Sequence, residues 1–251
     1  MLNYILDIFM HIGKYHVLML RVFSKPEKRT IFRKRIFEEI DKLSISSLPL
    51  VAIISIFMGA VITIQTAMGF ESPLLPPYAV GVAVRDSIIL EFAPTLVSLI
   101  LAGKIGSSIA SEIGTMRISE QIDALEIMGV NSATYLILPK IIALVFINPF
   151  LIILSMFTGI LGGFLLGIVT GVVTSHEYIY GIQYDFRFYH VTYALIKTIV
   201  FAFIISSIPA YHGYFAKGGA LEVGKASTTG VVYSSLLILL FNFILTQLLL
   251  A

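Results

Sequence analysis

Long apolar segments alternate with short polar clusters along the chain. A helix that crosses a membrane needs about 20 mostly apolar residues. Five segments meet this requirement, at residues 43–70, 87–103, 141–175, 198–215 and 229–250. The pattern therefore predicts an all-α integral membrane protein with five transmembrane helices in a region that extends over 43–250.

The third segment is unusually long. Residues 141–175 carry no charge over 35 positions, which is about 52 Å as a helix against a hydrocarbon core of about 30 Å. We expect one long helix that projects beyond the membrane, while two spans stay open as the alternative. Glycine recurs every fourth residue along this segment, at Gly159, Gly163, Gly167 and Gly171. Such spacing is typical of a face against which another helix packs closely.

The first 42 residues form a separate region, with 14 of the 32 charged residues. One helical face would carry Asn3, Asp7, His11, Lys14 and Arg21. The opposite face would carry Leu2, Ile5, Leu6, Phe9 and Ile12. This pattern predicts an amphipathic helix in the membrane interface, with packing against the protein itself as the alternative. Residues 25–42 then form a basic stretch suited to an anionic cytoplasmic leaflet.

Composition supports the membrane assignment, because 57% of the residues are apolar and only 13% are charged. Soluble domains carry about 25% charge, so disorder and nucleic-acid binding are excluded as classes. With residues 1–42, 104–140 and 217–225 in the cytoplasm, 14 of the 17 Lys and Arg lie on that side. The outer segments keep Arg85, Arg187 and Lys197. This bias predicts a cytoplasmic N-terminus, and Lys197 is assigned to a polar outer segment that begins at His176.

The sequence contains no complete motif for catalysis or for metal binding. Residues 219–225 match the first seven positions of a phosphate-binding P-loop, but Ala226 stands where Ser or Thr should hold magnesium. The expected context is a preceding strand, whereas a membrane span precedes this segment. The chain has no cysteine, and its five histidines lack metal-binding spacing. We expect no catalytic residue, no metal site, and no ATPase machinery on this chain.

Glu91 is a candidate functional residue, because an acid within the hydrocarbon zone is costly. Two structural alternatives stay open, a buried pair with a neighbouring helix or a protonated core carboxyl. Pro94 removes a backbone hydrogen bond three residues later, so we expect a kink or cavity beside Glu91. One functional hypothesis is a proton-coupled secondary transporter in which Glu91 carries the proton.

The stretch between the second and third spans carries a dense pattern. Residues 116–128 are interpreted as one short amphipathic helix, with Ile118, Ile122 and Leu125 on one face. Its polar positions, expected to be exposed, are Glu120, Asp123 and Glu126. A short cytoplasmic helix of this kind could dock into a groove on a soluble partner, and a mere connector explains the pattern equally well.

This region resembles the MlaE permease family, the membrane subunits of ABC systems that move phospholipid between membranes. The family pattern runs E-x-x-P, G-[KR]-x-G-[AS], E-[IL]-G-x-M-x-x-x-E-Q-[IL] and E-x-M-x-V. Its positions here are Glu91 and Pro94, residues 103–107, residues 112–116, residues 120–122, and Glu126, Met128 and Val130. Many fixed positions within 40 residues make the match specific, and the general layout extends it over nearly the whole chain.

The resemblance implies one permease domain over 1–251, with a cytoplasmic coupling segment at 111–130 after the second span. The residues expected to contact the ATPase subunit are Glu112, Gly114, Thr115, Met116, Arg117, Glu120, Gln121 and Asp123. Glu91 and Pro94 would lie at the wall of a lipid cavity between two copies of the chain. Some members carry an arginine before this acid where Leu90 stands here, which leaves an ion pair at Glu91 unsupported by the resemblance.

The resemblance also implies partners and a location. The expected partners are an ABC ATPase that holds ATP and magnesium, a periplasmic lipid-binding subunit with an MCE domain, and a small STAS-type cytoplasmic subunit. No cofactor is expected on the chain itself, and the substrate would be phospholipid. The expected location is the inner membrane of a bacterium, crossed several times.

Overall fold

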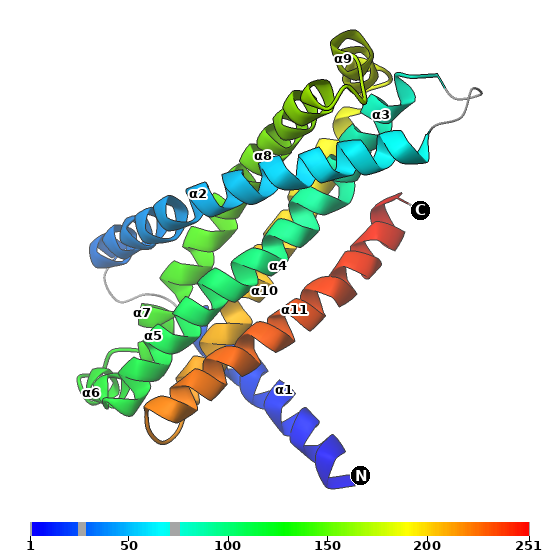
Figure 1. Ribbon diagram of the computed structural model, residues 1–251. Helices are drawn as coiled ribbons and strands as arrows, with labels where there is room; N and C mark the ends of the chain where they lie inside the picture. The colour runs from blue at the N-terminus through cyan, green and yellow to red at the C-terminus, as the bar shows by residue number, and fades with distance from the viewer. Residues whose placement is uncertain (1, 25–28, 71–75, 251) are drawn as a thin grey trace. The chain divides into compact units, whose positions relative to one another are not determined.

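The computed structural model describes residues 2–24, 29–70 and 76–250, and within these ranges every regular element is a helix (Figure 1). Five helical stretches are long and apolar enough to cross a membrane. They extend over Thr30–Gly69, Ala79–Ile118, Ser132–Val169, Phe188–Tyr214 and Ala220–Leu250. The prediction of an all-α membrane protein with five spans is therefore confirmed.

The first span is longer than the sequence pattern predicts. Helix α2 extends over Arg29–Gly69, 41 residues, or about 60 Å at 1.5 Å per residue. The expected boundary between basic region and span, at residues 42 and 43, lies inside this helix. No glycine or proline occurs between Arg29 and Leu48, so nothing in the backbone chemistry ends the helix there. Of the predicted basic stretch 25–42, residues 25–28 lie outside the described residues.

The second span contains two segments of wider, π-helical turn. It is built from α3 (Ala79–Ser87), η1 (Ile88–Leu96), α4 (Val97–Leu101), η2 (Ala102–Gly106) and α5 (Ser107–Ile118). Pro94 lies in η1 and has no N–H to donate. A π-helical turn changes the hydrogen-bond register where such a donor is missing. Where a kink or cavity was expected beside Glu91, the chain forms a π-helical segment.

The third span follows two short helices, α6 (Gln121–Ile127) and α7 (Ser132–Leu136), and is a single helix, α8 (Leu138–Val169). It ends six residues earlier than expected, so the prediction that Gly171 lies on its packing face is wrong. Gly171 has φ +71°, and its N–H bonds to Ile168 O while the Val172 N–H bonds to Gly167 O. This is a helix C-terminal turn, in which glycine supplies the left-handed conformation.

The last part of the chain contains α9 (Ser175–Gln183), α10 (Phe188–Tyr214) and α11 (Ala220–Leu250). Lys197 lies in the tenth position of α10, so its assignment to a polar outer segment is wrong. The P-loop-like residues 219–225 fall at the start of α11, and the element before them is helix α10. The strand that a P-loop requires does not precede them in this described part of the chain.

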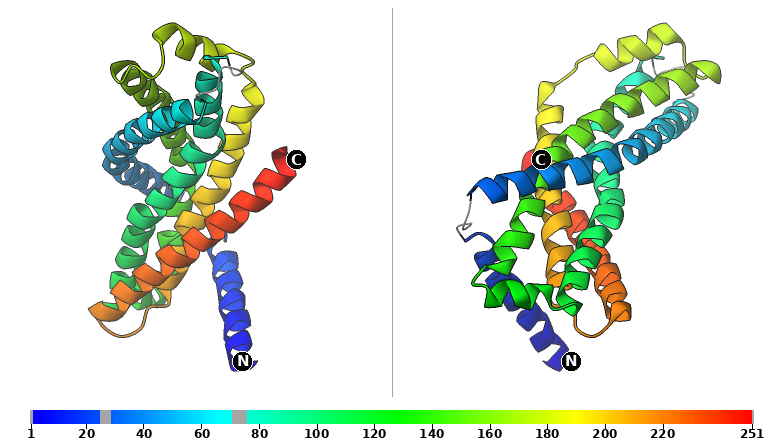
Figure 2. Two further views of the ribbon diagram at one scale, coloured as in Figure 1. Left: turned by 45° about the vertical axis from the view of Figure 1, so that its right-hand side comes forward. Right: turned by 90° about the vertical axis from the view of Figure 1, so that its left-hand side faces the viewer.

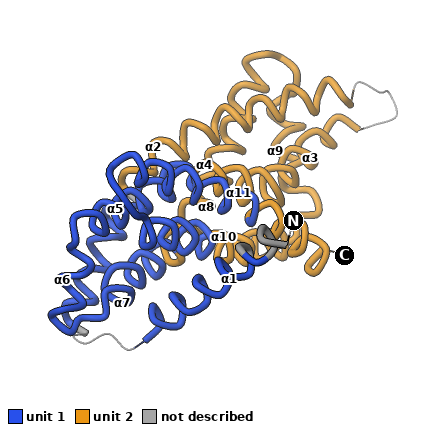
Figure 3. The backbone as a smooth tube through the Cα atoms, turned by 90° about the horizontal axis from the view of Figure 1, so that it is seen from below, with its two compact units in different colours: residues 1–43, 101–144, 202–237 blue, residues 44–100, 145–201, 238–251 orange. Residues whose placement is uncertain are grey.

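The chain divides into two compact units (Figure 3). Unit 1 contains residues 1–43, 101–144 and 202–237, and unit 2 contains residues 44–100, 145–201 and 238–251. In unit 1, α5, α10 and α11 approach closely. A methyl group on Gly213 would lie 2.6 Å from Ala110 O, and one on Gly230 would lie 3.0 Å from the Pro209 Cα. Small residues therefore bring α10 against both neighbours.

In unit 2, glycines bring α8 against α2. A methyl group on Gly163 would overlap Thr63 Oγ1 and the Tyr178 hydroxyl, and Gly59 lies directly against the Gly159 backbone. Gly167 faces Thr63 Cγ2 at 3.1 Å. The described face also includes Gly162, which abuts the Ile56 backbone and which the four-residue spacing missed.

Helix α1 (Leu2–Val22) belongs to unit 1, and its N-terminal part extends past the other helices of that unit (Figure 2). Leu6, Phe9 and Ile12 are exposed. On another face, the Tyr15 hydroxyl donates to Ser207 Oγ at 2.9 Å, and His11 Nδ1 lies 2.7 Å from the Tyr211 hydroxyl. The helix thus packs on α10 through polar side chains and leaves apolar ones free, as an interfacial helix requires. The side chains of residues 2–5, 7 and 8 lie outside the description.

Candidate functional site

The predicted coupling helix is interrupted, so the expectation of one helix over residues 116–128 is wrong. Helix α5 ends at Ile118, and α6 begins at Gln121. Between them Glu120 has φ +59°, a left-handed conformation that L-residues adopt at a cost. The Glu120 carbonyl then accepts from the Ala124 N–H at 2.9 Å and starts the new helix. Apolar spacing runs through the break, which is why periodicity alone did not reveal it.

Helix α6 is short and bounded at both ends by left-handed residues, since Gly129 has φ +81°. The Gly129 N–H bonds to Glu126 O, and the Val130 N–H bonds to Leu125 O, a closing pattern that suits glycine. Ile122 is fully buried against the rest of unit 1. In contrast, Ile127 and Met128 are 88% and 69% exposed. An apolar pair this exposed beside polar positions is typical of a contact surface for another protein.

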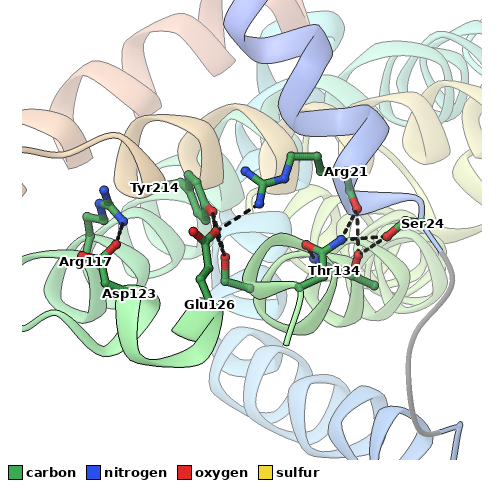
Figure 4. Close-up of polar contacts among 9 residues, drawn as sticks. Arg21, Ser24, Arg117, Asp123, Glu126, Thr134 and Tyr214 are labelled. Carbon is green, nitrogen blue, oxygen red and sulfur yellow. Dashed lines mark hydrogen bonds and ion pairs between the residues drawn. The ribbon is translucent and has the colours of Figure 1, made fainter. Parts of the chain in front are cut away.

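Glu126 joins α6 to three other helices in unit 1, namely α1, α7 and α10 (Figure 4). Its Oε1 accepts hydrogen bonds from Ser132 Oγ at 2.9 Å, the Tyr214 hydroxyl at 3.0 Å and Arg21 Nη2 at 3.1 Å. The Ser132 hydrogen bond, together with the Tyr214 hydroxyl and the Arg21 charge, holds the Glu126 pKa below its ordinary value. The carboxylate therefore connects α6 to α1, to the start of α7 and to the end of α10, while it stays 38% exposed, in line with the predicted exposed position.

The end of α1 is tied to the start of α7. Arg21 O accepts from Thr134 Oγ1 at 2.7 Å and from Asn131 Nδ2 at 3.2 Å. Asn131 also caps α7, because its side chain accepts from the Thr134 N–H. Ser24 Oγ lies 2.9 Å from Thr134 Oγ1 (Figure 4). These contacts satisfy the Arg21 carbonyl, which the end of the helix leaves free, and hold α1 against α7.

The eight residues expected to contact an ATPase lie in different surroundings. Thr115, Glu120 and Gln121 are exposed. Met116, Arg117 and Asp123 are half-buried, and Arg117 Nη1 donates to Asp123 Oδ1 at 2.7 Å across the helix break. Gly114 faces Val223 of α11, where a methyl group would lie 3.0 Å from Val223 Cγ1. Glu112 pairs with Lys42 at 2.8 Å and with Lys140 at 3.0 Å. Gly114 and Glu112 therefore face helices of their own unit.

Glu91 lies at the centre of a second polar cluster, in unit 2. Its Oε1 is 2.7 Å from Lys197 Nζ, and its Oε2 accepts from Asn242 Nδ2 and Thr95 Oγ1, each at 3.1 Å. The Lys197 side chain is 0% exposed, whereas that of Glu91 is 42% exposed. The ion pair on a neighbouring helix, left open by the sequence, is the arrangement found. A buried ammonium requires such a partner.

An apolar cavity of about 150 Å³ lies near this cluster in unit 2. Its lining includes Ile54, Met58, Ile88, Phe92, Leu96 and Ile100. Glu91 and Pro94, which were predicted at a lipid cavity, are not among the described residues that line it. Glu91 instead meets α10 and α11.

Several site residues were missed by the sequence reasoning. Arg21, Ser132 and Tyr214 carry no local signal that links them to Glu126. Lys197 did carry one, because it and Glu91 are charges of opposite sign beside or within long apolar segments. Opposite charges at membrane depth are expected to pair, and this search could have found the contact.

Comparison with known proteins gives a consistent assignment. The family model described as Permease MlaE matches residues 36–248. A probable ABC transporter permease protein of Rickettsia bellii is 36% identical over 94% of this chain and 91% of its own length. The chloroplastic protein TRIGALACTOSYLDIACYLGLYCEROL 1 of Arabidopsis thaliana is 30% identical, over 88% of this chain and 63% of its own length.

A further relative carries a more specific name. The intermembrane phospholipid transport system permease protein MlaE of Haemophilus influenzae is 29% identical over 96% of this chain and 93% of its own length. The family model covers all five spans from within α2 to within α11. The chain therefore belongs to the MlaE permease family.

Proposed function

We propose that this chain is the membrane subunit of an ABC transporter that moves phospholipid between two membranes. ATP would be hydrolysed on a separate partner subunit, which would also hold the magnesium ion. No bond of the lipid is broken, so the chain itself acts as a transport subunit and not as an enzyme. Family membership supports the permease role, and the Haemophilus relative supports phospholipid as the substrate.

The observation that carries this proposal is the surface of α6. Exposed Glu120, Gln121, Ile127 and Met128 surround a short helix that is anchored from behind by Ile122 and Glu126. A protruding apolar pair with a polar rim suits a groove on a soluble partner. Because α6 is anchored to α1 and α10, a displacement of α6 by an ATPase would move those helices with it. Of the eight residues expected to contact the ATPase, we therefore keep Thr115, Glu120 and Gln121, and we add Ile127 and Met128.

The location and remaining partners follow from the same reading. The charge distribution supports a cytoplasmic N-terminus, with α6 on the cytoplasmic side of a bacterial inner membrane. Two copies would enclose the lipid path, and the apolar residues exposed along α11, such as Leu236, Leu240 and Phe243, supply a surface for the second copy. An MCE-domain subunit in the periplasm and a STAS-type subunit in the cytoplasm complete the proposed assembly.

The Glu91 cluster favours this reading over a proton-coupled transporter. A proton carrier at Glu91 would have to break its bridge to Lys197 in each cycle and leave a fully buried ammonium without a counter-ion. The Glu91 side chain instead accepts hydrogen bonds from Lys197, Asn242 and Thr95, which come from three helical segments. We infer that it holds η1, α10 and α11 together within unit 2.

Charge reversal at Glu120 tests the proposed function. Glu120→Lys keeps the backbone cost of the left-handed residue nearly constant but inverts the charge at the proposed contact. We expect lipid-dependent ATP turnover by the assembled transporter to fall about tenfold, equivalent to about 1.4 kcal/mol at the contact. Insertion into the membrane should be unchanged. ATP turnover would be measured in vesicles of phosphatidylethanolamine and phosphatidylglycerol.

Glu222→Lys, an exposed charge reversal at the start of α11, serves as the control. Its lipid-dependent ATP turnover should stay within about twofold of the wild-type value. Full lipid-dependent turnover in Glu120→Lys would contradict the assignment of α6 as the ATPase contact.

A further inference from the structure

A network of four charges joins three helices of unit 1 at some distance in sequence from α6. Lys140 of α8 donates to Glu39 Oε1 of α2 at 2.6 Å and to Glu112 Oε2 of α5 at 3.0 Å. Lys42 of α2 also donates to Glu112 Oε2, at 2.8 Å. The four formal charges cancel, and each helix contributes at least one. We call Glu39, Lys42, Glu112 and Lys140 the charge network.

Lys140 is the buried centre of this network. Its side chain is 4% exposed, against 17% for Glu39, 35% for Glu112 and 53% for Lys42. The second oxygen of Glu39 is buried and accepts no hydrogen bond from the described residues. Lys140 is therefore the cation that neutralises Glu39. Its removal would leave the largely buried Glu39 carboxylate without its ion-pair partner, whereas Glu112 would keep its pair with Lys42.

The network lies at the wall of a polar cavity of about 310 Å³. Arg35 of α2 closes one side, since its guanidinium lies 3.6 Å over the Tyr135 ring and donates to Tyr135 O at 3.2 Å. Residues 35, 39 and 42 recur at helical spacing and so share one face of α2. The charged start of α2 is thus fastened to α5, α7 and α8.

We propose that Lys140 is a positioning residue for coupling, which makes α2, α5 and α8 move as one body when α6 is displaced. Glu112 lies about two turns before the end of α5, and α6 follows directly after the Ser119–Glu120 break. A displacement of α6 would therefore move Glu112 of α5 first. The ion pairs of Glu112 with Lys140 and Lys42 would then transmit the displacement to α8 and α2. This inference rests on the proposed function, because it assumes that a partner displaces α6.

The test uses the whole transporter, with its ATPase, in vesicles of phosphatidylethanolamine and phosphatidylglycerol. Lys140→Met removes the charge and keeps a similar length. We expect phospholipid moved per ATP hydrolysed to fall about tenfold, a typical size for coupling between sites. Lys140→Arg should restore it to within about twofold, because guanidinium still bridges two carboxylates. Normalisation to assembled complex separates coupling from a loss of folded protein.

Two further variants keep the test decisive if Lys140→Met assembles poorly. Glu39→Gln is nearly isosteric and removes one carboxylate of the bridge, so it should lower the same ratio. Glu38→Gln, one residue away and exposed, forms only a loose pair with Lys34 at 3.9 Å and should leave the ratio unchanged. An unchanged ratio in both Lys140→Met and Glu39→Gln would overturn the proposal while leaving the proposed function intact.

A distance measurement tests the mechanical part directly. Spin labels at Lys34→Cys of α2 and Ser108→Cys of α5 occupy exposed positions in this cysteine-free chain. In the wild-type background, the distance between the two labels should be the same with and without ATP. In Lys140→Met, the distribution of this distance should be broader. A separation that changes with ATP in the wild type would contradict the single-body account. If the unmodified transporter neither binds an ATPase nor moves lipid, both the proposed function and this inference fail.

Discussion

Charged side chains in this protein are held by specific partners on other helices. Glu126, Lys140 and Lys197 each bridge elements that lie far apart in sequence. Lys140 and Lys197 are 4% and 0% exposed, and a charge withdrawn from water must be compensated by a counter-ion or by several hydrogen bonds. Glu126 keeps 38% exposure, and its bridge rests on three hydrogen bonds to its Oε1. Each such residue therefore fixes the relative position of the helices within its unit.

The Glu126→Gln variant tests the link between α1 and α6. The carboxylate is 38% exposed, so we expect a loss of only about 1 kcal/mol of stability at neutral pH. Because its pKa is lowered in the folded state, the wild type gains this stability above the ordinary value and loses it as pH falls through the folded pKa. At pH 7, the midpoint of thermal unfolding in detergent micelles should therefore be lower for the variant than for the wild type.

The same two curves should converge in acid, well below the ordinary value of 4.5. Glu222→Gln removes an exposed carboxylate of a short-range pair with Lys225 and provides the control, with almost no change at either pH. A Glu126→Gln midpoint equal to that of the wild type at pH 7 would contradict the role assigned to this carboxylate.

At the residue scale, the sequence showed which charged residues stand out, but it did not show which side chains they contact. Glu91 stood out because it interrupts an apolar segment, which is a local signal. Its contacts to Lys197 and Asn242 lie 106 and 151 residues away. Helical periodicity contains no information about which faces of distant spans meet. For the same reason, the partners of Glu126 were not predicted, although its exposure was.

At the scale of elements, close helix contacts in unit 2 depend on glycine. Gly59, Gly159, Gly162 and Gly163 let the backbones of α2 and α8 approach to direct contact. In lipid there is little hydrophobic drive between helices, so packing of this kind carries much of their association. The spacing of four predicted the face, and Gly171 fell outside only because the helix ends at Val169.

The Gly163→Ala variant measures this packing. The added methyl group would overlap Thr63 Oγ1 and the Tyr178 hydroxyl, so α8 must shift from α2. We expect a loss of about 1–3 kcal/mol, the usual cost of overpacking, seen as a lower midpoint of thermal unfolding in detergent micelles. Gly224→Ala in α11 is the matched control, because nothing lies within 4 Å of its added methyl group. Equal destabilisation of both variants would show that glycine removal, rather than close packing, matters.

Element boundaries were the weakest part of the sequence prediction. Composition changes at residue 43, yet α2 continues through it, because a helix does not end where polarity changes unless the backbone favours an end. In contrast, α5 and α6 are separated at Glu120 although the apolar spacing continues. The backbone there adopts a conformation that glycine would signal and glutamate does not.

At the scale of the whole molecule, composition and charge distribution were sufficient to predict a five-span membrane protein. Both are global properties, so they do not depend on knowing which helices pack together. The family motif placed the expected coupling segment at 111–130, although it did not reveal the division of this stretch into α5 and α6. The two units were beyond prediction, because each combines three separate stretches of the chain.

The most direct test of the central claim asks what touches α6. The chain has no cysteine, so Met128→Cys, 69% exposed, gives a single reactive site, with Tyr180→Cys on α9, 47% exposed, as its matched control. We predict that membrane-impermeant thiol reagents reach position 128 only from the cytoplasm, and that a bifunctional cross-linker there captures the ATPase subunit while position 180 captures none. Labelling of position 128 from the opposite side, or cross-linking that never captures a nucleotide hydrolase, would contradict the account.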